Sequence, residues 1–77
     1  MPHIIIKLYP GRTEEVKQHL ANQISKCVAD IAKCSDKAVS IAIEEIPQNN
    51  WAERVYKPDI LDKEENLYKK PGYNPFA

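Results

Sequence analysis

The sequence predicts a small α/β (α+β) fold in which two parallel strands are joined by one long helix. Residues 3–9 alternate in polarity and are rich in isoleucine, which is typical of a strand. Residues 14–33 repeat apolar side chains with the period of a helix, and residues 38–46 alternate again. A strand, a helix and a second strand in this order favour a βαβ unit with a right-handed crossover.

The first strand has a clear inner face. Its alternation puts Ile4, Ile6 and Leu8 on one side of the sheet. Pro10 and Gly11 then end the strand, because proline lacks a backbone donor and glycine permits a sharp turn.

The helix has a recognisable start and one apolar face. Thr13 is placed as an N-cap, and Glu14 and Glu15 lie where the positive end of a helix dipole favours acidic side chains. The predicted apolar stripe consists of Val16, Leu20, Ile24, Cys27, Val28 and Ile31.

One helix covers only one face of a two-stranded sheet. Val39, Ile41 and Ile43 alternate along the second strand, and the other face of the sheet carries Ile5 and Ala42. Parallel sheets normally have both faces covered, and open edges invite pairing. We therefore expect a symmetric partner subunit to complete the sheet.

The chain is predicted to form a single domain over residues 1–77, with a core at 2–51 and a C-terminal arm and tail at 52–77. Residues 48–50 are expected to form a loop, and 52–56 a short strand or hairpin arm that Lys57 and Pro58 interrupt. Residues 62–68 favour one or two helical turns. The tail, which contains Tyr73 and Phe76, is expected to lie over a partner subunit or to be disordered.

Composition excludes several classes of function. The chain has eleven basic and eleven acidic residues, so we expect neither nucleic acid nor a membrane surface as a partner. No apolar run approaches the roughly 20 residues of a membrane span, and the start does not resemble a signal peptide. Cys27 and Cys34 are too far apart along a helix for a disulfide and form no zinc motif. We therefore expect a cytoplasmic protein without a metal site.

Pro2 is the residue of greatest chemical interest. Initiator methionine is normally removed before a small residue, so the mature chain is expected to begin at Pro2. Its nitrogen then becomes a secondary amine, which the ring and the following strand hold rigid. A free α-amine has a pKa of about 8, and shelter among apolar side chains beside a cation would lower it. We interpret Pro2 as a general base.

Three features occur together at the spacing of a known family. They are Pro2, the helix entry Gly11-Arg12-Thr13-Glu14-Glu15, and the strand Val39-Ser40-Ile41-Ala42-Ile43-Glu44-Glu45. Together they resemble the 4-oxalocrotonate tautomerase family. The resemblance covers residues 2–51 and fades in the C-terminal third.

The resemblance implies roles for four residues. Pro2 corresponds to the general base of the family, and Arg12 to the arginine that contacts a substrate carboxylate. Many members carry a second arginine where this chain has Ser40, and an aromatic pocket residue where it has Trp51. The Trp51 indole N–H is expected to bind a developing enolate, or the ring to exclude water. With one cation instead of two, the chain should favour monoanionic enols over dicarboxylates such as 2-hydroxymuconate.

The sequence thus predicts an isomerase that tautomerises small 2-hydroxy-dienoate or enolpyruvate-type acids without a cofactor. Its substrate would be a small enol or 2-oxo acid. A homodimer is favoured over the hexamers of the family, because the C-terminal third is longer and charged. A dehalogenase or decarboxylase of the same superfamily and a non-enzymatic interaction module are the alternatives. His3 and His19, which have no partner nearby in sequence, are interpreted as solvated or packed.

Overall fold

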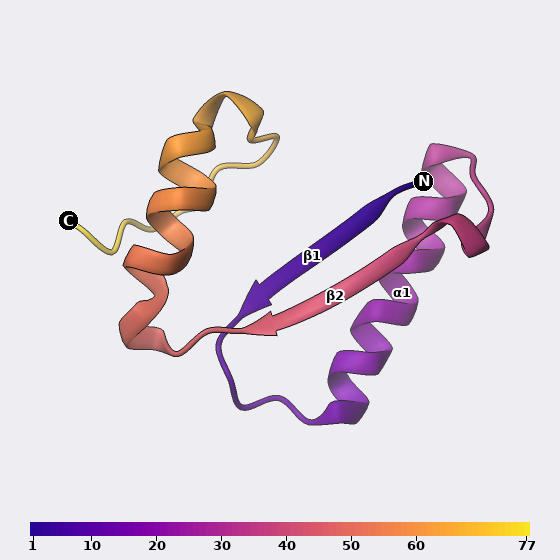
Figure 1. The fold of residues 1–77 in the computed structure, drawn as a ribbon, viewed down its shortest axis with the longest axis horizontal. Helices are drawn as coiled ribbons and strands as arrows, with labels where there is room; N and C mark the ends of the chain where they lie inside the picture. Colours follow the sequence, from indigo (N-terminus) through magenta and orange to yellow (C-terminus); the bar gives the residue numbers. More distant parts are fainter. The chain divides into compact units, whose positions relative to one another are not determined.

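The computed structural model describes all residues, 1–77, and divides into two compact units. The first comprises Met1–Glu45 and the second Ile46–Ala77, and each is described by itself. The first unit contains strand β1 (His3–Leu8), helix α1 (Glu14–Ala32), a 3₁₀ turn η1 (Asp36–Ala38) and strand β2 (Ser40–Glu45). Figure 1 shows the two strands side by side with α1 connecting them.

The two strands are parallel, as predicted. Their register runs from His3 opposite Ser40 to Leu8 opposite Glu45. The sheet has only these two strands, so each strand has one unpaired edge. The predicted βαβ unit is therefore confirmed, with the second strand beginning two residues later than expected, because η1 occupies the start of the predicted segment.

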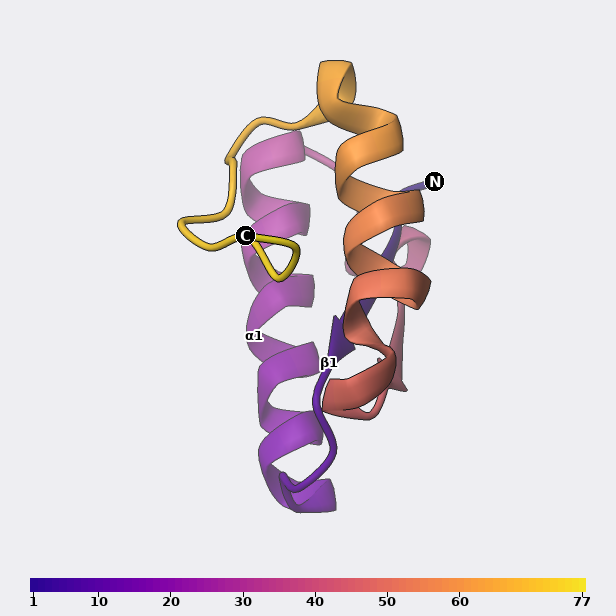
Figure 2. The same ribbon diagram turned by 90° about the vertical axis from the view of Figure 1, so that its left-hand side faces the viewer.

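Helix α1 covers one face of the sheet (Figure 2). Ile41 and Ile43 of β2 line a groove together with Ala21 of α1, so their side chains face the helix. The alternation of a strand then directs His3 and Ile5 to the opposite face, and Ile5 is 51% exposed. This face has no cover within the first unit.

Local signals determine both ends of α1. Thr13 is the N-cap, and its Oγ1 accepts a hydrogen bond from the backbone N–H of Val16 at 3.2 Å. At the other end Lys33 adopts a left-handed conformation with φ 58°, and the N–H of Cys34 donates to the carbonyl of Ala29. Such a left-handed residue ends a helix by satisfying its last carbonyls. The helix ends one residue before the predicted limit.

The buried face of α1 is narrower than the predicted apolar stripe. Leu20, Ile24 and Val28 are half-buried, whereas Val16 is 49% and Ile31 73% exposed. Two strands about 5 Å apart are narrower than a helix with its side chains. The outer part of the stripe therefore stays in contact with solvent.

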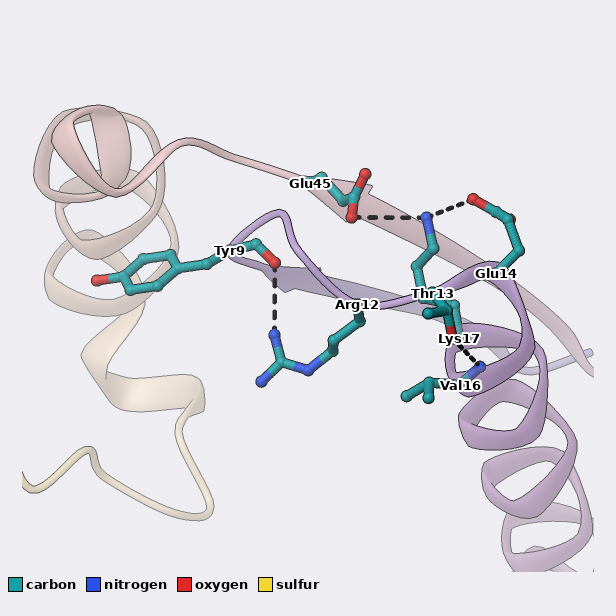
Figure 3. A network of polar contacts seen from close by, with 7 residues as sticks. All are labelled: Tyr9, Arg12, Thr13, Glu14, Val16, Lys17 and Glu45. Carbon is teal, nitrogen blue, oxygen red and sulfur yellow. Dashed lines mark hydrogen bonds and ion pairs between the residues drawn. The ribbon is translucent and has the colours of Figure 1, made fainter.

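Lys17 links the start of α1 to the end of β2. Its Nζ lies 2.7 Å from Glu14 Oε1 and 3.5 Å from Glu45 Oε2, as Figure 3 shows. The hydrogen bond from Lys17 to Glu14, together with the charge of Glu45, raises the pKa of Lys17 above its ordinary value. The sequence alone does not show this link, because Lys17 and Glu45 are 28 residues apart and only the fold brings them together.

The second unit is helical, so the predicted strand or hairpin arm at 52–56 is wrong. It contains a 3₁₀ turn η2 (Gln48–Asn50), a π-helix η3 (Ala52–Ile60) and a 3₁₀ helix η4 (Leu61–Asn66). Val55 and Tyr56 are buried at 5% and 6% exposure. Pro58 does not interrupt η3, which continues to Ile60. The aromatic and β-branched composition favoured a strand, but these apolar side chains recur at helical spacing.

The C-terminal tail folds back onto η3 of its own chain. The hydroxyl of Tyr56 donates to the carbonyl of Tyr73 at 3.1 Å, and their rings lie 5.4 Å apart. Phe76 packs edge-on against Tyr56, with ring centroids 5.9 Å apart. The aromatic tail residues thus have packing partners within one chain. None of the helices has the length and apolar character that crossing a membrane requires.

Thr13→Ala should destabilise the protein by about 1 kcal/mol, because it removes the side-chain acceptor of the N-cap. Urea denaturation at one fixed protein concentration measures this loss. Thr13→Ser keeps the hydroxyl and should remain close to the native stability. Equal stability of the alanine and native proteins would contradict this role of the cap.

Candidate active site

The structure brings Pro2, His3 and Ser40 together at the amino ends of the two strands. The backbone N–H of Ser40 donates to the carbonyl of Pro2 at 3.1 Å. The Oγ of Ser40 lies 2.7 Å from Nδ1 of His3, a hydrogen bond whose direction depends on the tautomer of the ring. Pro2 is half-buried, while His3 and Ser40 are exposed. Parallel pairing explains this cluster, because it places the amino ends of both strands at the same edge.

Arg12 lies beyond the other end of β1, in the link to α1 (Figure 3). Its Nη1 donates a long hydrogen bond of 3.4 Å to the carbonyl of Tyr9, and its side chain is exposed. The six steps from Pro2 to Leu8 span about 20 Å of extended chain. The fold therefore separates Arg12 from Pro2 within one chain.

Trp51 belongs to the second unit, where it directly precedes η3. Its side chain is half-buried, and its indole N–H donates to the hydroxyl of Tyr73 at 2.7 Å. A donor held in this way would have to leave Tyr73 before it could bind an enolate. The role of Trp51 at a substrate stays a prediction.

Two cavities of the structure do not include the predicted site residues. A shallow groove of about 230 Å³ lies between α1 and β2, and a smaller one of about 110 Å³ lies in the second unit. The larger is lined by Glu14, Lys17, Gln18, Ala21, Ile41 and Ile43. No three His, Cys, Asp or Glu side chains are grouped so that they could hold a metal ion.

His3 is the residue whose surroundings the sequence did not reveal. Its partner Ser40 is 37 positions away, and only the parallel register makes them neighbours. Aligning the predicted strand starts would have paired His3 with Ala38, two residues away from its partner in the structure. Tyr73 is a similar case, because its contact with Trp51 depends on the path of the tail.

A comparison of the sequence with a model of a protein family assigns the chain to that family over most of its length. The sequence model of the family described as "Tautomerase enzyme" matches residues 2–54. The chain belongs to the tautomerase family. It is therefore an isomerase, and this membership favours the enzyme over a non-enzymatic interaction module.

Named relatives of this tautomerase support the assignment. It is 42% identical over 77 residues to a "Probable tautomerase" of Xylella fastidiosa (strain 9a5c), covering 100% of this chain and 94% of the relative. It is 36% identical over 75 residues to "Tautomerase PptA" of Pectobacterium carotovorum subsp. carotovorum (strain PC1), covering 96% and 99%. These alignments extend through the C-terminal third.

Solved structures show the same fold for this tautomerase. A crystal structure of apo unfused 4-OT superposes with a TM-score of 0.62 at 33% identity, covering 64% of this chain and 80% of that one. YwhB, described as a homologue of 4-oxalocrotonate tautomerase, gives a TM-score of 0.60 at 28% identity, covering 61% and 77%. The predicted fold class and resemblance are both confirmed.

Tyr73→Phe should shift the indole Nε1–H resonance of Trp51 upfield and speed its exchange with solvent, because the acceptor hydroxyl is removed. Trp51 is the only tryptophan, so one indole signal reports the change in a ¹⁵N-labelled sample. Tyr68→Phe, at a fully exposed tyrosine, is the matched control and should leave the signal in place. An unmoved signal in Tyr73→Phe would mean that the two side chains are not bonded in solution.

Proposed function

We propose that this tautomerase interconverts keto and enol forms of small 2-oxo acids, with the amine of Pro2 as the general base once Met1 is removed. The observation that carries the proposal is the fixed position of Pro2. Its carbonyl accepts a hydrogen bond from the backbone N–H of Ser40, next to the first residue pair of the parallel sheet. The Pro2 nitrogen therefore belongs to an ordered end of the strand. Membership in a tautomerase family supports the reaction type.

The reaction requires only a proton carrier. The amine takes the proton from the enol oxygen as that O–H bond breaks, and it returns a proton to carbon as the C–H bond forms. The carbonyl double bond replaces the carbon–carbon double bond, and no electron enters or leaves the substrate. One rigid base that keeps the proton between the steps can perform both transfers, so we propose a reaction without a cofactor.

We further propose that Arg12 acts on a substrate bound at Pro2 of another subunit. The two residues lie at opposite ends of β1, about 20 Å of extended chain apart. A two-fold axis across the sheet makes the strands of two copies antiparallel, which puts the Arg12 end of one copy beside the Pro2 end of the other. The unpaired strand edges and the exposed Ile5 support such a homodimer.

The charges of the proposed site residues support one class of substrate. Arg12 provides one guanidinium for one carboxylate, and position 40 carries a neutral serine. The proposed substrate is therefore a monoanionic 2-hydroxy-dienoate or enolpyruvate-type acid, such as phenylenolpyruvate. We propose that Trp51 serves as an aromatic residue that shields the substrate from water.

We assign the enzyme to the cytoplasm. Cys27 is exposed and Cys34 half-buried, and both are free thiols, which suits a reducing compartment. Detection of the protein mainly in an oxidising extracytoplasmic fraction of its cells would contradict the assignment.

Pro2→Ala should lower kcat for phenylenolpyruvate ketonisation by about 100-fold or more, because the rigid secondary amine becomes a flexible primary one. The measurement is the loss of enol absorbance, made after intact mass has verified removal of Met1. Pro10→Ala changes an exposed proline outside the proposed site and is the matched control. Retention of Met1 in an active protein, or native kcat in Pro2→Ala, would refute the general-base role.

Mixing two inactive variants tests the shared site. Arg12→Ala should have a strongly lowered kcat/KM, because the carboxylate loses its partner. Random reassembly of Pro2→Ala with Arg12→Ala should restore about a quarter of native activity, since half of the dimers are hybrids and each has one intact site.

The mixed sample must be exchanged under mild denaturation and refolding, and sedimentation velocity must show a dimer. If the mixture stays as inactive as its components, both residues act within one chain. A folded, active monomer at micromolar concentration would exclude the dimer itself.

A further inference from the structure

We propose that His3 is a substrate-contacting residue of the Pro2 site, and that Ser40 positions it. In this proposal Nε2–H of His3 donates a hydrogen bond to the enol or carbonyl oxygen of the substrate. The inference rests on the proposed function of Pro2, and it explains how a site with serine at position 40 recognises the reacting oxygen.

The first step of the argument is proximity. His3 follows Pro2 directly, so covalent geometry limits the distance from the Pro2 nitrogen to the His3 Cα to roughly 5 Å. An imidazole reaches a similar distance from its own Cα. The oxygen and the carbon that exchange a proton in an enol are separated by only two bonds. A single small enol can therefore contact the amine of Pro2 and the ring of His3 together.

The second step is the orientation of the ring. Ser40 makes two hydrogen bonds to this end of β1. Its backbone N–H donates to the carbonyl of Pro2, and its Oγ is hydrogen-bonded to Nδ1 of His3. When the serine hydroxyl donates to Nδ1, the neutral ring carries its proton on Nε2. This is also the more stable tautomer of an isolated histidine side chain. Nε2 has no partner within the protein and is available to a ligand.

The third step is the electrostatic setting. His3 lies on the sheet face opposite α1, so no group of the helix competes for its ring. Lys7 and Glu44 are the charged residues of that face, four positions farther along the strands, or roughly 13 Å away. Neither strand therefore places a charged side chain next to the ring. A neutral donor there stabilises charge developing on oxygen without binding a second carboxylate.

The kinetic test compares two substitutions at His3. His3→Phe removes the donor and should lower kcat for phenylenolpyruvate on the order of tenfold or more. His3→Gln places an amide N–H near the position of Nε2 and should retain most of the native kcat. His19→Gln, at the exposed histidine of α1, is the matched control and should behave as native. Thermal unfolding and sedimentation verify that each variant is folded and assembled.

The spectroscopic test does not depend on turnover. In the native protein, ¹⁵N NMR of the His3 ring at a pH where it is neutral should show the proton on Nε2. Ser40→Ala should shift the ring toward a mixture of tautomers and lower kcat less than His3→Phe does. A merely structural hydrogen bond between strands would change stability in Ser40→Ala without this coupled change in kcat.

The outcomes separate this inference from the proposed function. If Pro2→Ala is inactive while His3→Phe keeps the native kcat, the inference is wrong and the general base stands. A native ring protonated on Nδ1 would also overturn the inference, whatever the activity. If the native enzyme does not turn over the enol, or if Pro2→Ala is fully active, the proposed function is wrong, and the role of His3 that rests on it is wrong as well.

Discussion

The parallel pairing of β1 with β2 is the interaction on which the rest of the first unit depends. Its register places His3 opposite Ser40 and carries on to Leu8 opposite Glu45. Because parallel strands start at the same edge, Pro2 and its two polar neighbours, His3 and Ser40, form one cluster. For the same reason the link containing Arg12 leaves the sheet at the far edge. The same register thus brings Pro2, His3 and Ser40 together and leaves Arg12 at the other end of the sheet.

The first unit also leaves part of its apolar surface exposed to solvent. One helix covers one face of a two-stranded sheet, so Ile5 remains half in solvent and the outer part of the helix stripe, including Ile31, is exposed. Exposed apolar surface and unpaired strand edges both favour association. The proposed arrangement of two copies would meet both needs, because it would bring Arg12 of one copy toward Pro2 of the other and would bury more apolar surface.

The second unit is stabilised differently. Its buried Val55 and Tyr56 lie on a π-helix, and the tail is attached to that helix by aromatic contacts and hydrogen bonds. Trp51 is part of this network through Tyr73. The position most readily interpreted as a pocket aromatic therefore also serves to anchor the tail. Relatives that align through the whole chain share this C-terminal third, beyond the region of the family's sequence match.

The sequence by itself determined the βαβ unit, the capped start of α1 at Thr13 and the family, because periodicity, caps and motif spacing are local signals. It could not determine the helical state of residues 52–60, where strand-forming residue types conflict with helical spacing. It also could not show that Ser40 lies beside His3, that Lys17 bridges to Glu45, or that Arg12 lies far from Pro2. Those relations depend on the register between segments distant in the chain, and only the tertiary structure sets that register.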